Sequence, residues 1–166
     1  MGAPDDPGQA LCPECGLCCS GAIYGVVPVT ADEEESVEEL GMAVLAFGED
    51  RRGFGLPCAA LAGTRCTIYP DRFTTCRNFR CQLLLDMDDG KETLETARAR
   101  IAEAKRLLAE LREAAGPDEG IVKARLRALR GEGDPAFNLA GMAMEYFLDR
   151  HFRKPHQRQF DRPDGD

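Results

Sequence analysis

The spacing of apolar residues in the second half of the chain predicts three helices. Between Glu92 and Ala115 the apolar residues recur every three or four positions, which places them on one helix face. These positions are Leu94, Ala97, Ile101, Ala104, Leu108 and Leu111. Gly116 and Pro117 then end the segment. We therefore predict a helix over residues 92–115 whose apolar face is buried within the protein.

Two shorter helices are expected after this one. Residues 121–130 repeat the helical pattern, with an apolar face formed by Ile121, Val122, Leu126 and Leu129. The other face carries Lys123, Arg125, Arg127 and Arg130, which we interpret as a solvated basic face. Asp134 and Pro135 are typical of an N-cap and a first helical residue, and predict a helix that runs to about Phe152.

The first half of the chain has a less regular pattern. The short β-branched run 22–29 predicts one strand, which Pro28 restricts to a sheet edge or a strand end. Thr30 and Glu33 form a capping-box pattern that begins an acidic helix reaching Leu40. Residues 51–55 are expected to form a polar turn, and residues 58–81 to be rich in loops.

This order of elements predicts a mostly α, small α+β fold. An irregular, metal-organised cysteine-rich module at residues 11–90 is expected to pack on a C-terminal helical bundle at residues 91–157. With 166 residues and 43% hydrophobic residues, both parts are expected to belong to one compact domain. Residues 1–10 and 158–166 are expected to be disordered tails.

Charge and composition exclude several classes of partner. The net charge of −8 disfavours a nucleic-acid partner, and 7% aromatic residues leave few platforms for stacking bases. The chain has neither a signal-peptide pattern nor an apolar run long enough to span a bilayer. We expect a cytoplasmic protein without membrane association, whose partners are a metal ion and a further protein. The oligomeric state is left open.

Eight cysteines in the first half of the chain are the clearest functional signal. In a reducing compartment, so many closely spaced thiols favour metal coordination over disulfide bonds. A Cys-x2-Cys turn can place two thiolates on one ion, and Gly16 can supply the positive φ that such a turn uses. We predict that all eight are metal ligands: Cys12, Cys15, Cys18, Cys19, Cys58, Cys66, Cys76 and Cys81.

The spacing leaves the metal open. Eight cysteines divide evenly into two four-thiolate zinc sites. Cys-x2-Cys-x2-Cys with a remote cysteine after a proline is also the pattern of a 4Fe-4S cluster, and Cys58 follows Pro57. The adjacent Cys18 and Cys19 point in different directions, so Cys19 either serves a second metal or remains beside the first site for redox or transfer chemistry.

The cysteine pattern resembles a known family. The segments that carry the resemblance are Cys12 to Cys19, Cys66-Thr-Ile-Tyr-Pro-Asp-Arg72, Cys76-Arg77-Asn-Phe79 and Cys81. Together they resemble the YkgJ-type cysteine cluster family over about residues 11–82. Its members are described as zinc- or iron-chelating proteins, so the resemblance implies metal binding. Phe73 departs from the family, which usually has proline there.

Two functions are compatible with this pattern. The first is a zinc or iron module whose metal is structural and whose surface serves a partner. The alternative is an iron-sulfur enzyme or accessory in electron or methyl transfer, because flagellin lysine methylases look similar in their cysteine cluster. Whether the protein is an enzyme is left open. Arg72 or Arg77 could offset the thiolate charge, and Tyr69 or Phe79 could shield the site from water.

Overall fold

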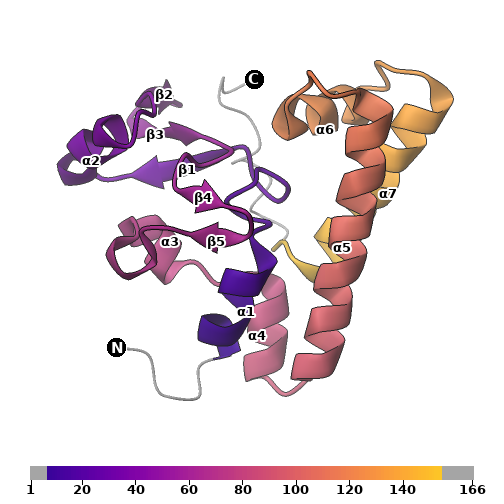
Figure 1. Ribbon diagram of the computed structural model, residues 1–166, viewed down its shortest axis with the longest axis horizontal. Coiled ribbons are helices and arrows are strands. Elements are labelled where there is room, and N and C mark those ends of the chain that lie inside the picture. The colour runs from indigo at the N-terminus through magenta and orange to yellow at the C-terminus, as the bar shows by residue number, and fades with distance from the viewer. Residues whose placement is uncertain (1–6, 155–166) are drawn as a thin grey trace. The chain divides into compact units, whose positions relative to one another are not determined.

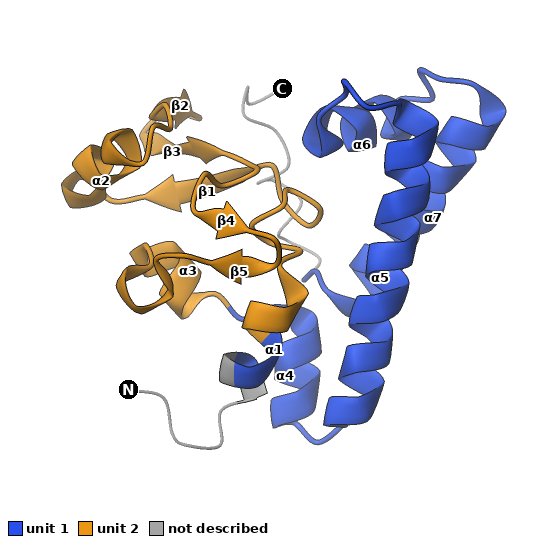
Figure 2. Ribbon diagram, viewed as in Figure 1, with its two compact units in different colours: residues 1–11, 80–156 blue, residues 12–79, 157–166 orange. Residues whose placement is uncertain are grey.

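The computed structural model describes residues 7–154, and the fold is mostly α-helical with a few short strands, as predicted (Figure 1). The chain divides into two compact units, 1–11 with 80–156 and 12–79 with 157–166 (Figure 2). We call the first the helical unit and the second the cysteine unit, and we describe each by itself. The division falls at 79/80, whereas the predicted module boundary lay at 90/91, because residues 82–88 form a helix that the sequence pattern missed.

The helical unit contains four helices after residue 80. They are α4 (Gln82–Asp88), α5 (Leu94–Ala115), α6 (Ile121–Leu129) and α7 (Pro135–His151). The long helices α5 and α7 pack side by side, and α6 packs against α7 (Figure 1). The predicted N-cap of α7 is confirmed, since the Asp134 carboxylate accepts a hydrogen bond from the Phe137 backbone N–H at 3.0 Å.

The buried face of α5 matches the prediction except at its start. Ala97, Ile101, Ala104, Leu108 and Leu111 are all buried. Leu94 is instead 40% exposed, because it is the first helical residue and precedes the packed turns.

The interpretation of α6 as carrying a solvated basic face is wrong at Arg125. Its side chain is buried, and its Nε donates to Glu145 Oε1 at 2.6 Å. Arg153 donates to the other carboxylate oxygen of Glu145 at 2.6 Å. The guanidinium tolerates burial because α7 supplies its counter-charge, and a carboxylate twenty residues away is not visible in the pattern of α6 alone.

The cysteine unit combines short strands with short helices. The elements are the end of α1 (Pro7–Cys15), β1 (Val26–Val29), η1 (Ala31–Glu33), α2 (Glu34–Glu39), β2 (Leu45–Phe47), β3 (Arg51–Gly55), β4 (Leu61–Ala62), β5 (Arg65–Cys66), η2 (Tyr69–Asp71) and α3 (Thr74–Asn78). The predicted first strand is confirmed at β1, and the predicted acidic helix is formed by η1 and α2. The capping box is present, with Glu33 Oε2 accepting from the Thr30 N–H at 3.0 Å.

The turn predicted at residues 51–55 is in fact a central strand. β3 pairs antiparallel with β1 and with β2, giving the order β1-β3-β2. Gly53 suggested a turn, but in the sheet a Cβ at this position would lie 2.2 Å from the Val27 carbonyl oxygen. Glycine is therefore present for the close approach of two strands, not for a turn.

A small apolar core supports the cysteine residues of this unit. Val37, Phe54 and Phe73 are buried together, and the rings of Phe54 and Phe73 have centroids 5.0 Å apart. Cys58 and Cys76 pack against this core. Phe73, the departure from the family pattern, therefore contributes to the packing that positions two cysteines.

The predicted tails are only partly covered by the structure. Residues 1–6 and 158–166 lie outside the described residues. The prediction of disorder is wrong for residues 7–10, which form the first turns of α1, a helix that carries the buried Leu11. Among the described helices, none is long and apolar enough to cross a bilayer.

Candidate metal centre

Seven of the eight predicted ligands belong to the cysteine unit. Cys12 and Cys15 lie on α1, Cys18 and Cys19 in the turn that follows, Cys58 between β3 and β4, Cys66 on β5 and Cys76 on α3. Cys81 belongs to the helical unit, where it is the N-cap residue of α4. All eight are half-buried, and within residues 7–154 none forms a disulfide bond. Their sulfur atoms are thus not used in disulfide bonds, and deprotonation would convert them to the thiolates that bind metals.

The first two cysteines lie on a helix, whereas a Cys-x2-Cys turn was predicted there. Cys12 and Cys15 share the last turn of α1, where residues three apart face the same side. The helix ends at Cys15, and Gly16 follows it with a φ of +66°, the positive φ predicted at this position. A Cβ at Gly16 would lie 2.9 Å from the backbone Cα of Thr64, so this turn sits directly against the β4–β5 hairpin.

Backbone hydrogen bonds join the two distant cysteine segments. The Cys58 N–H donates to the Cys19 carbonyl at 2.9 Å. The Thr64 hydroxyl donates to the Pro13 carbonyl at 3.1 Å. The first bond joins two main-chain atoms and the second joins a short side chain to a main-chain carbonyl, so residues 12–19 are connected with residues 58–66. The segments are therefore held together without any contribution from sulfur.

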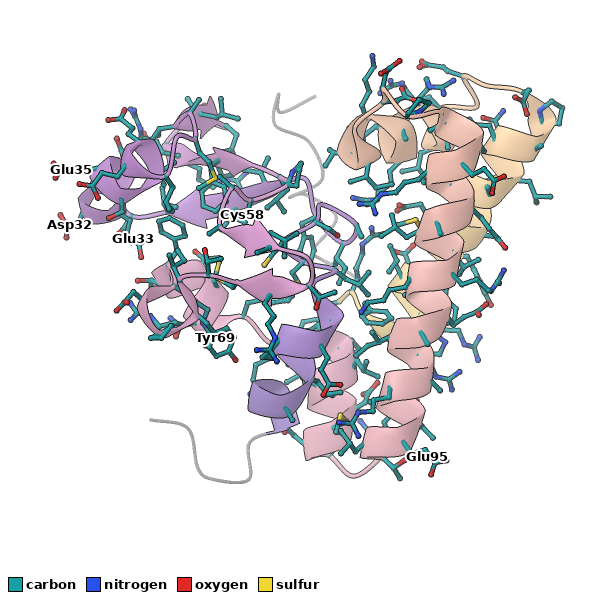
Figure 3. All side chains as sticks on the ribbon, in the orientation of Figure 1. Asp32, Glu33, Glu35, Cys58, Tyr69 and Glu95 are labelled. Atoms are coloured by element: carbon teal, nitrogen blue, oxygen red, sulfur yellow. The ribbon has the colours of Figure 1, made fainter. Side chains whose placement is uncertain are left out.

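The hairpin returns Cys66 toward Cys58. The Leu61 N–H donates to the Cys58 carbonyl at 3.1 Å, and Leu61 pairs with Cys66 across β4 and β5. Thr67 closes the hairpin, since both its N–H and its hydroxyl donate to the Ala60 carbonyl, at 2.8 and 3.0 Å. Figure 3 shows Cys58 within the unit, on the segment that leads into this hairpin.

A second set of bonds positions α3 and Cys76. The Thr74 N–H donates to Glu33 Oε1 at 2.6 Å, and the Thr75 hydroxyl donates to the Pro28 carbonyl at 2.6 Å. Burial alone would raise the pKa of Glu33, but the hydrogen bonds from Thr30 and Thr74 outweigh it and lower the pKa below its usual value. Glu33 is therefore an ionised anchor for α3 near neutral pH.

At least five thiols interact electrostatically, and we call Cys12, Cys19, Cys58, Cys66 and Cys76 the thiol cluster. Burial raises the pKa of Cys19 to about 11, helped by the charges of Cys58, Cys66 and Cys12. Burial raises the pKa of Cys76 to about 12, helped by Cys19, Cys58 and Cys66. The pKa of Cys58 is also raised, by burial first and then by Cys66. Ionising these thiols together is unfavourable without a nearby cation.

Arg72 is a cation that interacts with the thiol cluster. Its guanidinium carbon lies 3.7 Å from the centroid of the Tyr69 ring, a cation–π contact. Its charge opposes the rise in the pKa of both Cys19 and Cys76. Its Nε is buried and has no hydrogen-bond partner among the residues that the structure describes. Of the two arginines considered from sequence, Arg72 therefore lies where it can offset thiolate charge.

The other two candidates for tuning the site have different surroundings. Arg77 is exposed on α3. The Phe79 ring packs edge-on against Tyr24, with centroids 5.3 Å apart, so it contributes to the packing of the unit.

The sequence reasoning missed Thr64 and Glu33 as residues that anchor the site through hydrogen bonds. Gly63, whose φ is +64°, is a residue type that indicates a turn before Thr64, but the sequence does not identify Pro13 as the partner of Thr64.

The donor chemistry fits a thiophilic metal ion. Half-buried thiols that raise one another's pKa would be relieved of their mutual repulsion by a bound cation, which also favours the thiolate form. Within residues 7–154, no group of three or more His, Cys, Asp or Glu side chains is already arranged to hold an ion. The members of the thiol cluster thus lie near one another, and a ligand shell would have to close as an ion binds.

A compact unit in which turns, short strands and a hairpin gather thiols is typical of a cysteine-rich metal-binding domain. Residues 11–105 match the family model described as "CxxCxxCC: Putative zinc- or iron-chelating domain", and this match covers more than half of the chain. The protein therefore belongs to the CxxCxxCC family. The match contains all eight cysteines and ends within α5. No curated protein and no solved structure matches the chain.

Proposed function

We propose that the thiol cluster binds zinc or iron through thiolates, and that the bound metal stabilises the cysteine unit while the surface of that unit serves a protein partner. The observation that carries this proposal is the gathering of thiols from separate segments by hydrogen bonds such as Cys58 N–H to Cys19 O. Cys15, Cys18 and Cys81 complete the predicted set of eight ligands.

The short elements of the unit explain why a metal would stabilise it. Its longest strand, β3, has five residues, and α2, the longest helix that lies wholly within it, has six. Small units of this kind commonly depend on metals or disulfides for stability. Metal–thiolate bonds would add stabilisation where the cysteines are clustered. Arg72 would offset part of the negative charge of a thiolate-rich centre.

The second candidate is an iron-sulfur enzyme or accessory in electron or methyl transfer. The observation that favours it is that at least five cysteines interact with one another, which is more than a single four-thiolate centre uses. A thiol that does not bind the iron-sulfur cluster, such as Cys19, would then lie beside it and be available for redox or transfer chemistry.

Metal analysis of protein purified without oxygen tests both candidates. A colourless protein that contains about one or two zinc ions per chain supports the structural module. A brown protein with broad visible absorption and both iron and acid-labile sulfide supports the iron-sulfur candidate. Protein that carries neither metal, and takes up neither zinc nor iron after reduction, would contradict the proposal.

A cysteine variant and a matched control test the ligand assignment. Cys58→Ser is expected to lose most of the metal, whereas Ala59→Ser places the same hydroxyl on the exposed neighbouring residue and should keep it. Because Cys58→Ser could also impair folding, chelation of the wild-type protein provides a second measurement. Chelation should open residues 12–79 to proteolysis and leave residues 80–154 protected. Full metal content in Cys58→Ser would refute the assignment.

A further inference from the structure

Helix α7 has two apolar faces, and only one of them is covered in the described structure. The covered face lies inside the helical unit and is formed by Phe137, Gly141, Met144 and Leu148. On the opposite face, Leu139, Met142 and Tyr146 are 68%, 60% and 66% exposed. Leu139 and Met142 are three residues apart, and Met142 and Tyr146 are four apart, so the three side chains form one stripe along the helix. We call this stripe the α7 seam.

The outer face of α5 differs from the seam in composition. It carries charged residues that pair with one another, with Arg106 bound to Glu103 at 2.6 Å and also to Glu110. Within residues 135–151, charged residues reach the line of the α7 seam at its C-terminal end, where Asp149 and Arg150 follow Tyr146, and Asp149 is already bonded to Arg153 at 3.1 Å. Large apolar side chains in a row, without the charges found on the neighbouring helix, are typical of a surface that associates with another protein.

We propose that the α7 seam pairs with the same seam of a second copy of this chain, with the two helices antiparallel. A two-fold axis near Met142 and Ala143 would place Leu139 against the partner's Tyr146, and Tyr146 against the partner's Leu139. Leu139 and Tyr146 would then each meet a large side chain of the partner, while Met142 would lie against the partner's Ala143, whose small side chain lets the helices approach closely. The surface is therefore self-complementary, as a two-fold interface requires.

The charges at the two ends of α7 favour the antiparallel orientation. Asp134 precedes the helix, and so does Glu132, which pairs with Arg130 at 2.8 Å. At the other end Arg150 and Lys154 outnumber Asp149, which is bonded to the buried Arg153. In an antiparallel pair the basic end of one copy faces the acidic end of the other, and in a parallel pair like charges would meet. The Arg150 Nη1 already donates to the Tyr146 hydroxyl at 3.2 Å, which directs this guanidinium along the seam.

The size of the seam determines how strong the association can be. A stable complex commonly buries about 800 Å² per partner, and the exposed face of one helix of this length supplies less. We therefore expect a weak dimer that is populated at about 100 μM chain and dissociates at about 1 μM. Because the seam contains no cysteine, this association does not depend on the metal centre.

Sedimentation velocity of the full chain, in reductant, tests the proposal. Wild-type protein should shift from monomer to dimer with concentration, and Leu139→Glu should raise the dissociation constant at least tenfold. Leu129→Glu is the matched control, since Leu129 is 44% exposed on α6 and lies off the seam. Circular dichroism should show equal helix content in all three proteins. A wild-type monomer at the highest concentration, or a dimer unaffected by Leu139→Glu, would overturn the proposal.

A mixing experiment tests the antiparallel register. Leu139→Glu and Tyr146→Lys should each be largely monomeric alone. Mixed, they should form a heterodimer, because the antiparallel register places the two new opposite charges against each other and leaves the second Leu139–Tyr146 contact intact. A parallel pair would instead align equivalent positions. Absence of a heterodimer in the mixture would therefore refute this register.

Discussion

Replacing Glu145 by glutamine would test whether the helical unit depends on a buried ionic network. The side chains of Arg125, Glu145 and Arg153 are 1%, 4% and 1% exposed. Glu145 accepts a hydrogen bond of 2.6 Å from each arginine, while Asp149 is a second partner of Arg153 at 3.1 Å. Glu145→Gln keeps the size of the side chain but leaves Arg125 without the carboxylate that neutralises it in this network.

The expected loss of stability follows from this burial. Removing one member of a buried ion pair typically costs about 3–5 kcal/mol, because an uncompensated charge remains away from water. Asp149 retains part of the pairing of Arg153, so we expect the cost to arise mainly at Arg125. A loss of about 3 kcal/mol would be a large share of the roughly 5–15 kcal/mol that holds a typical domain folded.

Urea unfolding of the full chain, followed by far-ultraviolet circular dichroism, measures this loss. Glu110→Gln is the matched control, because Glu110 is paired with Arg106 on the exposed face of α5. We expect that control to cost less than about 1 kcal/mol. Replacing the whole network with Arg125→Met, Glu145→Leu and Arg153→Met should recover most of the stability lost in Glu145→Gln. Equal losses in Glu145→Gln and Glu110→Gln would refute the reasoning.

The same network predicts how stability changes with pH. Burial alone would raise the pKa of Glu145, but the charges and hydrogen bonds of Arg125 and Arg153 outweigh it and hold the pKa below its ordinary value of 4.5. The stabilisation is therefore present above about pH 4.5 and lost as the pH falls through the lower, folded-state pKa. Glu145→Gln should show a shallower loss of stability on acidification. An unchanged acid slope in that variant would contradict this assignment.

Two further predictions concern the cysteine unit. Arg72→Gln should weaken zinc binding about tenfold or more in a competition assay, because it removes the cation that opposes thiolate repulsion. Arg77→Gln, on the exposed side of α3, should leave zinc binding unchanged. Equal effects of the two substitutions would contradict the role of Arg72. Gly16→Ala should destabilise the unit more than Gly63→Ala in chemical unfolding. Both positions have a positive φ, but only at Gly16 does the new Cβ meet backbone, at 2.9 Å from Thr64, so similar losses would show that the turn can shift.

Features that depend on neighbouring residues in the chain were predictable. The caps of α7 and of η1, and most of the buried face of α5, follow from side chains that act within a few residues of one another. The type and spacing of the eight cysteines likewise suggested metal chemistry, and the family match agrees with that class of function. Local physics is sufficient in these cases.

Features that depend on distant partners were not predictable from one sequence. Gly53 indicated a turn, yet β3 is a central strand because β1 and β2 pair with it from both sides. Arg125 had the pattern of a solvated residue, yet a carboxylate on α7 compensates its charge in the interior. Arg72 and Arg77 are the same residue type five positions apart, and packing alone places the first beside the thiols and the second in solvent. Residue type therefore specified which atoms can bind a metal, whereas long-range hydrogen bonds and burial, which join segments remote in the chain, selected which of them meet.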